Sequence, residues 1–136
     1  FRAPIQKNIR DEIWLKLIGN LSFNPISALT GATLEQICND KGTEAIVRAM
    51  MTEAKIIAEE LGAKINMSIE KRIDGARKVG AHKTSMLQDI EAGKPIEIDS
   101  IIIAVKELGE LTCSPTPYIN TILNLTLQKA KLIGCL

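Results

Sequence analysis

Helix start and stop signals recur along almost the whole chain, and they constrain the fold more than any other feature of the sequence. Capping residues such as Thr33 and Ser68 precede apolar residues at helical spacing, and glycines such as Gly62 and Gly80 follow them. We therefore predict an all-α fold, a compact domain of six or seven helices without a sheet. The predicted helices span residues 11–30, 33–38, 43–61, 68–79, 85–92, 99–108 and 116–132.

Several of these boundaries carry specific predictions. Thr33 begins a capping box, and Thr43 is expected to cap the long third helix. Pro25 is expected to kink or split the first helix, because proline lacks the amide hydrogen and its ring clashes with the preceding turn. Thr116 followed by Pro117 is typical of an N-cap with proline at the first helical position.

The segment 96–108 can be interpreted in two ways. Apolar and acidic residues alternate over 96–99, which suits a strand, whereas the apolar run that continues to Leu108 suits a helix. We favour a helix from Asp99, because no other segment would pair with a lone strand.

Composition describes one ordinary soluble domain. The 136 residues are 46% hydrophobic and carry a net charge of +1, so the chain can bury a core without disulfides or a structural metal. Scattered basic residues and only four aromatic residues argue against nucleic-acid binding. Three cysteines without metal-ligand spacing are expected to be free thiols in a reducing cytoplasm, and no apolar run approaches the ~20 residues of a membrane helix.

Common catalytic and nucleotide-binding motifs are absent from the sequence. It contains no GxGxxG, P-loop, HExxH or GxSxG, so the usual Gly-rich turn cannot hold a dinucleotide, and cofactor-binding residues are not assigned. The chain opens at Phe1 rather than at methionine. We expect residues 1–136 to be a single helical domain of a longer polypeptide.

A polar stripe on the first predicted helix is the most informative local feature. Lys16, Asn20 and Asn24 follow at intervals of four residues, and with Ser27 they occupy a stripe about 80° wide at ~100° per residue. The rest of this helix is largely apolar, so the stripe should lie beside the core, where unpaired polar groups are costly. Either Lys16 reaches solvent while the asparagines bond locally around Pro25, or the stripe faces a substrate.

A second candidate region runs from His82 to Asp99. It places Ser85 and Glu97 within a predicted helix and the turn that follows it. A purely structural interpretation is a capped amphipathic helix that stops at 93–95. His82 has no partner at metal-ligand spacing and is expected to be hydrogen-bonded or solvated, so no metal site is predicted. The basic residues Arg77, Lys78 and Lys83 are expected to form a solvated face.

Two motifs in these regions carry a resemblance to a known family. The run SMLQDI at 85–90, then GKP at 93–95 and EID at 97–99, resembles the SMLQD…EID signature of the ketopantoate reductases (2-dehydropantoate 2-reductases). The first helix resembles their WxKLxxNxxxNPxxAL pattern, and Thr116-Pro117 resembles their late Thr-Pro. The resemblance covers residues 11–132 and concerns the C-terminal helical domain of that family.

The resemblance implies a substrate-binding domain like the C-terminal domain of 6-phosphogluconate dehydrogenase. It further implies an N-terminal Rossmann domain, absent from this chain, that holds NADPH. The family reduces 2-dehydropantoate, a 2-oxo acid, to (R)-pantoate on the route to pantothenate and coenzyme A. The isolated domain is expected to be inactive.

Residue roles follow from the same resemblance. Lys16 matches the family's catalytic lysine, which donates a proton to the carbonyl oxygen as hydride arrives. Asn20, Asn24 and Ser85 match substrate-binding positions, and Glu97 matches the acidic residue that binds the substrate hydroxyl and helps to place the lysine. A cation within hydrogen-bond reach of the developing oxyanion suits this reaction.

Two alternatives remain open. One is a sister reductase that acts on another 2-oxo acid with the same lysine chemistry. The other is a helical interaction or dimerisation module without catalysis. The long apolar helices also lead us to expect a homodimer through an exposed apolar patch.

Overall fold

Seven α-helices and no strand form the part of the chain that the structure, a computed structural model, describes. It describes the backbone of residues 2–136 and the side chains from Asp11 onward. The all-α prediction is confirmed. The helices are α1 (Arg2–Thr30), α2 (Leu34–Asn39), α3 (Lys41–Glu60), α4 (Ile69–Val79), α5 (Ser85–Glu91), α6 (Ile98–Leu111) and α7 (Pro117–Ile133).

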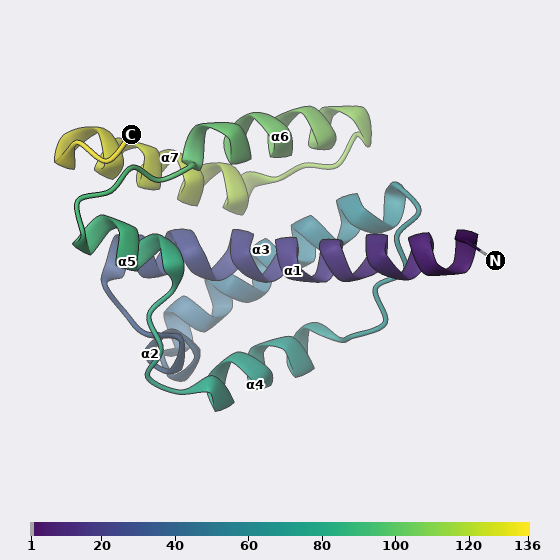
Figure 1. The fold of residues 1–136 in the computed structure, drawn as a ribbon, viewed down its shortest axis with the longest axis horizontal. Coiled ribbons are helices and arrows are strands. Elements are labelled where there is room, and N and C mark those ends of the chain that lie inside the picture. The colour runs from purple at the N-terminus through teal and green to yellow at the C-terminus, as the bar shows by residue number, and fades with distance from the viewer. Residues whose placement is uncertain (1) are drawn as a thin grey trace.

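The longest helix, α1, runs through the middle of the molecule, and the other helices are arranged around it (Figure 1). It packs against α3, α5 and α7, while α2 packs on α4 and α6 packs on α7. In Figure 1, α6 and α7 lie on one side of α1 and α3, and α4 lies on the opposite side. One side of α1 therefore packs into the core, and the side toward α4 and α5 contributes to the site described below.

Helical periodicity explains how α3 fills the centre of the core. Its buried residues recur at intervals of three or four, so they form one continuous apolar face. Met50 and Met51 are fully buried there together with Ile37, Ile98 and Ile119 from other helices. The buried residues of α3 are Val47, Met50, Met51, Ala54, Ile57 and Ala58.

Local capping signals place most of the helix ends. The capping box is confirmed: Gln36 N donates to Thr33 Oγ1 over 3.3 Å, and Thr33 N donates to Gln36 Oε1 over 2.9 Å. Ser68 caps α4 through the amide of Lys71, and α4 ends at Gly80, whose φ of +88° favours glycine.

The predicted cap of α3 is wrong by three residues. The helix begins at Lys41, and the Asp40 carboxylate accepts a hydrogen bond from Thr43 N over 2.9 Å. Thr43 instead donates its hydroxyl to Ile37 O over 2.7 Å. An aspartate directly after a short helix caps the next one, so the link between α2 and α3 is tighter than the sequence suggested.

The first helix also departs from its prediction. It begins at Arg2 rather than at Asp11, and it is not split at Pro25. Pro25 is buried between Phe23 and Ile26, two core residues of the same helix. Burial of this apolar face holds the backbone helical, although Leu21 O lacks the amide donor that residue 25 would otherwise supply.

The ambiguous segment 96–108 is helical. Helix α6 begins at Ile98 and continues to Leu111, one residue earlier and three residues later than predicted. Ile96, two residues before this helix, donates its N–H to Cys135 O over 2.8 Å, which joins the start of α6 to the segment after α7. The alternation at 96–99 thus marks an extended approach to a helix.

The last helix begins as predicted at Pro117, but its cap comes from elsewhere. Thr116 makes no side-chain capping hydrogen bond. The Glu53 carboxylate of α3 accepts from Tyr118 N over 3.0 Å and from Ile119 N over 2.9 Å. The negative carboxylate also interacts favourably with the positive end of the helix dipole.

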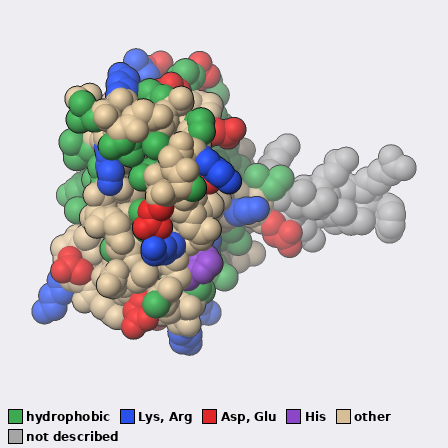
Figure 2. Space-filling model, turned by 60° about the vertical axis from the view of Figure 1, so that its left-hand side comes forward, with side chains coloured by type: hydrophobic (Ala, Val, Ile, Leu, Met, Phe, Trp, Pro, Cys, Tyr) green, Lys and Arg blue, Asp and Glu red, His purple; other side chains and the backbone are tan. Residues whose placement is uncertain are grey.

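The charged side chains show no single-sign patch on the face seen in Figure 2, where acidic and basic groups are mixed with hydrophobic ones. None of the helices that the structure describes is long and apolar enough to cross a membrane.

Candidate functional site

A cleft with both polar and apolar lining residues lies between α1, α4 and the start of α5. Its volume is about 450 Å³, and it is open to solvent. The cleft is lined by Asn20 and Asn24 from α1, by Arg72 from α4, by His82 from the segment before α5, and by Ser85, the first residue of α5. Residues more than 60 positions apart in the sequence, Asn24 and Ser85 among them, therefore meet at one hollow.

The predicted stripe on α1 passes from solvent into the core. The side chains of Lys16 and Asn20 are exposed, Asn24 is half-buried and Ser27 is fully buried. Lys16 does not line the cleft, but it lies one helical turn, about 6 Å, before Asn20 on the same face. The stripe was expected to lie beside the core along its length, and its first half instead faces outward.

A chain of hydrogen bonds joins the inner end of this stripe to α5. Ser27 Oγ donates to Asn24 O over 3.0 Å, so the buried contact between the Ser27 and Thr84 hydroxyls has Thr84 as its donor. Thr84 Oγ1 also accepts from Leu87 N over 3.2 Å and caps α5. The first residue of α5, Ser85, is thereby fixed against the α1 turn that carries Asn24.

Glu97 occupies a different part of the molecule's surface from the cleft residues. It is exposed, it holds the N-cap position of α6 without a side-chain capping bond, and it does not line the cleft. Of the five predicted site residues, the structure brings Asn20, Asn24 and Ser85 together. The roles of all five remain predictions.

His82 contributes to the rim of the cleft through its backbone and an exposed side chain. Its N–H donates to Gly80 O over 2.8 Å, and its carbonyl accepts from Leu34 N over 3.0 Å. The second of these bonds links the segment before α5 to the start of α2.

Arg72 is the cleft residue that sequence reasoning missed. It lies on α4, and its guanidinium lies against Gly19 of α1 beside Asn20. In the sequence it is one basic residue in a charged helix, and the only local signal was its position one residue before the buried Ile73. Its place in the cleft results from the approach of α4 to α1.

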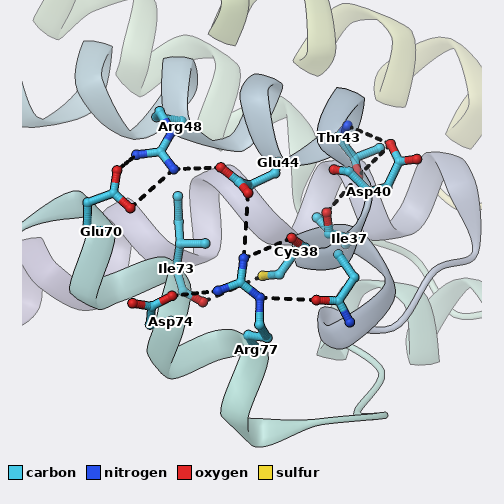
Figure 3. A network of polar contacts seen from close by, with 11 residues as sticks. Ile37, Cys38, Asp40, Thr43, Glu44, Arg48, Glu70, Ile73, Asp74 and Arg77 are labelled. Atoms are coloured by element: carbon cyan, nitrogen blue, oxygen red, sulfur yellow. Dashed lines mark hydrogen bonds and ion pairs between the residues drawn. The ribbon is translucent and has the colours of Figure 1, made fainter.

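A polar network holds α4 against α2 and α3 (Figure 3). Arg77 donates to Cys38 O over 3.0 Å and to Asn39 Oδ1 over 3.1 Å, and it pairs with Asp74 at 2.5 Å. Burial raises the pKa of the Cys38 thiol, an effect that the nearby Arg77 charge partly opposes. The expectation that Arg77 belongs to a solvated face is wrong, because it ties two helices together.

Arg48 extends the same network from α3. It pairs with Glu44 at 2.5 Å and contacts the Glu70 carboxylate at the start of α4. Hydrogen bonds to Glu44 and Glu70 raise the pKa of Arg48. The network fixes the N-terminal turn of α4 and its last turn, and Arg72 lies between them.

The fold and the cleft define an all-helical domain with a hollow between its central helix and two shorter helices. This chain belongs to the ketopantoate reductase family, because residues 8–130 match the family described as "Ketopantoate reductase PanE/ApbA C terminal". The resemblance seen in the two motifs is confirmed.

Individual relatives agree with this assignment. A 2-dehydropantoate 2-reductase from Mesorhizobium japonicum is 54% identical over 134 residues, which are 98% of this chain and 41% of that protein. A crystal structure of a proposed ketopantoate reductase from Ralstonia solanacearum MolK2 has a TM-score of 0.86 and 42% identity, covering 94% of this chain and 39% of the other. The chain thus spans about two-fifths of the length of these relatives.

A further solved structure concerns assembly. It is described as a dimeric ketopantoate reductase from Staphylococcus aureus, and it matches with a TM-score of 0.73 and 27% identity over 93% of this chain and 44% of that one.

Proposed function

We propose that this chain is the substrate-binding and catalytic-lysine domain of an NADPH-dependent 2-dehydropantoate 2-reductase, which reduces ketopantoate to (R)-pantoate for pantothenate and coenzyme A synthesis. The observation that carries the proposal is the cleft, where Asn20, Asn24 and Ser85 converge one turn from Lys16. The named relatives support the same reaction.

Lys16 has the chemistry that ketone reduction requires. Hydride addition leaves negative charge on the carbonyl oxygen, and an ammonium group stabilises that charge and supplies the proton. The side chain is exposed at the outer end of the α1 stripe, so its flexible stem can reach a carbonyl bound at the mouth of the cleft.

Neutral groups deeper in the stripe would orient the substrate. The amides of Asn20 and Asn24 and the hydroxyl of Ser85 offer donors and acceptors to an acid that carries a ketone, a carboxylate and a hydroxyl. We assign Glu97 to the substrate hydroxyl and to placing Lys16. Glu97 does not line the cleft, so this assignment rests on the family motif alone.

The cofactor would be bound mainly by the rest of the protein. The sequence has no Gly-rich nucleotide-binding turn, and the part of the chain that the structure describes is helical throughout, without the strand that precedes such a turn. We propose an N-terminal Rossmann domain that holds NADPH, which supplies the hydride.

The three cysteines are free, which supports a location in the cytoplasm.

We also propose a homodimer. An apolar groove of about 190 Å³ between α1 and α6 is lined by Trp14, Leu17 and Ala104 among others, and the dimeric relative supports pairing. Light scattering of the full-length protein should give twice the monomer mass; a strict monomer at high concentration would reject this assembly.

The catalytic assignment is tested in the full-length protein with Lys16→Met and Lys16→Arg. Arginine keeps the charge but does not release a proton near neutral pH. We expect kcat to fall by about 10²- to 10⁴-fold in both variants with the fold intact. Lys131→Met, an exposed lysine in the last turn of α7, is the matched control and should keep full activity.

Unchanged turnover in Lys16→Met would reject the lysine chemistry, whereas a full-length protein that turns over no 2-oxo acid would favour the non-catalytic dimerisation module. A sister reductase would keep the Lys16 effect and prefer another 2-oxo acid.

A further inference from the structure

Arg72 differs from the other arginines whose side chains the structure describes. Arg48 and Arg77 both pair with carboxylates, at Glu44 and Asp74 for example. Arg72 forms no ion pair with any side chain from Asp11 onward, and residues 1–10 contain no aspartate or glutamate. The chain itself therefore supplies no carboxylate partner for Arg72 from residues 1–136.

The guanidinium is also only partly solvated. Nε of Arg72 is buried and has no hydrogen-bond partner among the described residues, although a buried donor without a partner is costly. The side chain is half-buried, and it is the one residue with a permanent charge among those that line the cleft in the described part of the chain. A planar fork of donors in such a place suits an anion, above all a carboxylate.

The absence of a side chain at Gly19 leaves the space that the Arg72 guanidinium occupies. A Cβ at Gly19 would lie 2.9 Å from Arg72 Cζ, closer than such atoms approach in proteins. Any side chain larger than hydrogen would therefore move the guanidinium. Gly19 lies three residues after Lys16 on α1, a backbone rise of about 4.5 Å along the helix axis, so the guanidinium lies against the same stretch of α1 that carries Lys16.

We propose that Arg72 is the residue that binds the carboxylate of the 2-oxo acid substrate, an inference that rests on the proposed function. The ketone and carboxylate carbons of a 2-oxo acid are bonded to each other. Cations carried by, and packed against, the same stretch of α1 can therefore serve one oxygen group each, Lys16 the ketone and Arg72 the carboxylate. Arg72 thus selects for 2-oxo acids over neutral ketones.

The test compares variants of the full-length protein by their kinetics with 2-dehydropantoate. Arg72→Gln should raise KM for the acid by about 10- to 100-fold, with a much smaller change in kcat and no change in KM for NADPH. The KM of Arg72→Lys for the acid should lie between those of the wild type and Arg72→Gln, because lysine keeps the charge but lacks the planar pair of donors. Lys71→Gln removes the same charge from an exposed neighbour outside the cleft and should leave both KM and kcat unchanged.

Gly19→Ala tests the geometry with Arg72 still present. Alanine is a better helix former than glycine, and the atoms it would meet are the end of a flexible side chain, so the fold should keep its stability. KM for the acid should nevertheless rise several-fold because the guanidinium is displaced.

Two results would overturn the inference while leaving the proposed function intact. One is an active protein whose KM for the acid is unchanged in Arg72→Gln. The other is a rise in KM for NADPH alone, which would assign Arg72 to a cofactor phosphate. If Arg72→Gln does not fold, an unchanged KM in Gly19→Ala would also overturn it. A wild-type protein that reduces no 2-oxo acid would instead reject the proposed function, and this inference with it.

Discussion

Thr84 donates its hydroxyl hydrogen to Ser27 across 57 positions of sequence, and this buried contact joins α1 to the start of α5. The Ser27 hydroxyl in turn donates a hydrogen bond to Asn24 O, and the Thr84 hydroxyl oxygen accepts one from Leu87 N. Asn24 and Ser85, two of the cleft residues, are the immediate neighbours of these bonds. The geometry of the cleft therefore depends on two hydroxyl groups, of which Thr84 lines the cleft and Ser27 lies buried behind it.

Loss of either hydroxyl should destabilise the fold. Thr84→Val removes a helix cap and a buried donor, and we expect a loss of about 2–3 kcal/mol in the free energy of unfolding. Ser27→Ala should cost about 1–2 kcal/mol, because it leaves the Thr84 hydroxyl hydrogen without its acceptor. Urea denaturation measures both values. The double variant should lose less than the sum, because the two groups share one bond.

Thr121→Val provides the control for these variants. Its hydroxyl is exposed and bonds to Pro117 O within the same helix. We expect a change within about 0.5 kcal/mol. Additive losses in the Ser27 and Thr84 variants would show that the two hydroxyls act independently.

Glu53 should contribute to stability through the start of α7. Glu53→Gln removes the charge that faces two backbone amides and the helix dipole, so the free energy of unfolding should fall by about 1 kcal/mol. Denaturation of Glu59→Gln, an exposed glutamate of the same helix, supplies the comparison and should show no such loss. An equal free energy of unfolding in the two variants would contradict the capping role of Glu53.

Gly75 inside α4 and Gly80 at its C-terminal cap should respond to alanine in opposite directions. Gly75 lies in the exposed helix interior, and a Cβ there would meet nothing within 4 Å, so Gly75→Ala should stabilise by about 0.5–1 kcal/mol. Gly80 ends the helix at a φ of +88°, and Gly80→Ala should destabilise by roughly 1 kcal/mol. Thermal unfolding of both variants beside the wild type measures the signs.

Stability should fall in alkaline solution through Cys38. Burial raises the pKa of this thiol above its ordinary value of 9.0, so the folded chain retains a proton that the unfolded chain has already lost. This contribution is fully present below about pH 9 and is lost as the pH rises through the raised pKa. The unfolding free energy of Cys38→Ala should decline less steeply above pH 9 than that of the wild type. Parallel pH profiles would contradict this.

Local signals predicted much of the fold, and tertiary contacts account for what they missed. The capping box at Thr33 and the cap at Ser68 depend on residues three positions away, so the sequence displays them directly. Pro25 could not be judged locally, because burial of the helix around it overrides its effect on the backbone.

The candidate site divides in the same way. Asn20 and Asn24 share a helix face by their spacing alone, and the family motif pointed to Ser85. Arg72 carries no motif, and its position depends on the packing of α4 over Gly19. The Glu53 cap of α7 likewise joins residues 65 positions apart, which no local pattern reveals.

The most direct measurement of the central claim is NADPH consumption by the full-length protein supplied with 2-dehydropantoate and, in parallel, with a panel of other 2-oxo acids. We predict rapid oxidation of NADPH with a clear preference for 2-dehydropantoate, and loss of that turnover in Lys16→Met. Preference for another acid would keep the lysine chemistry and change the substrate. No consumption with any 2-oxo acid would contradict the account.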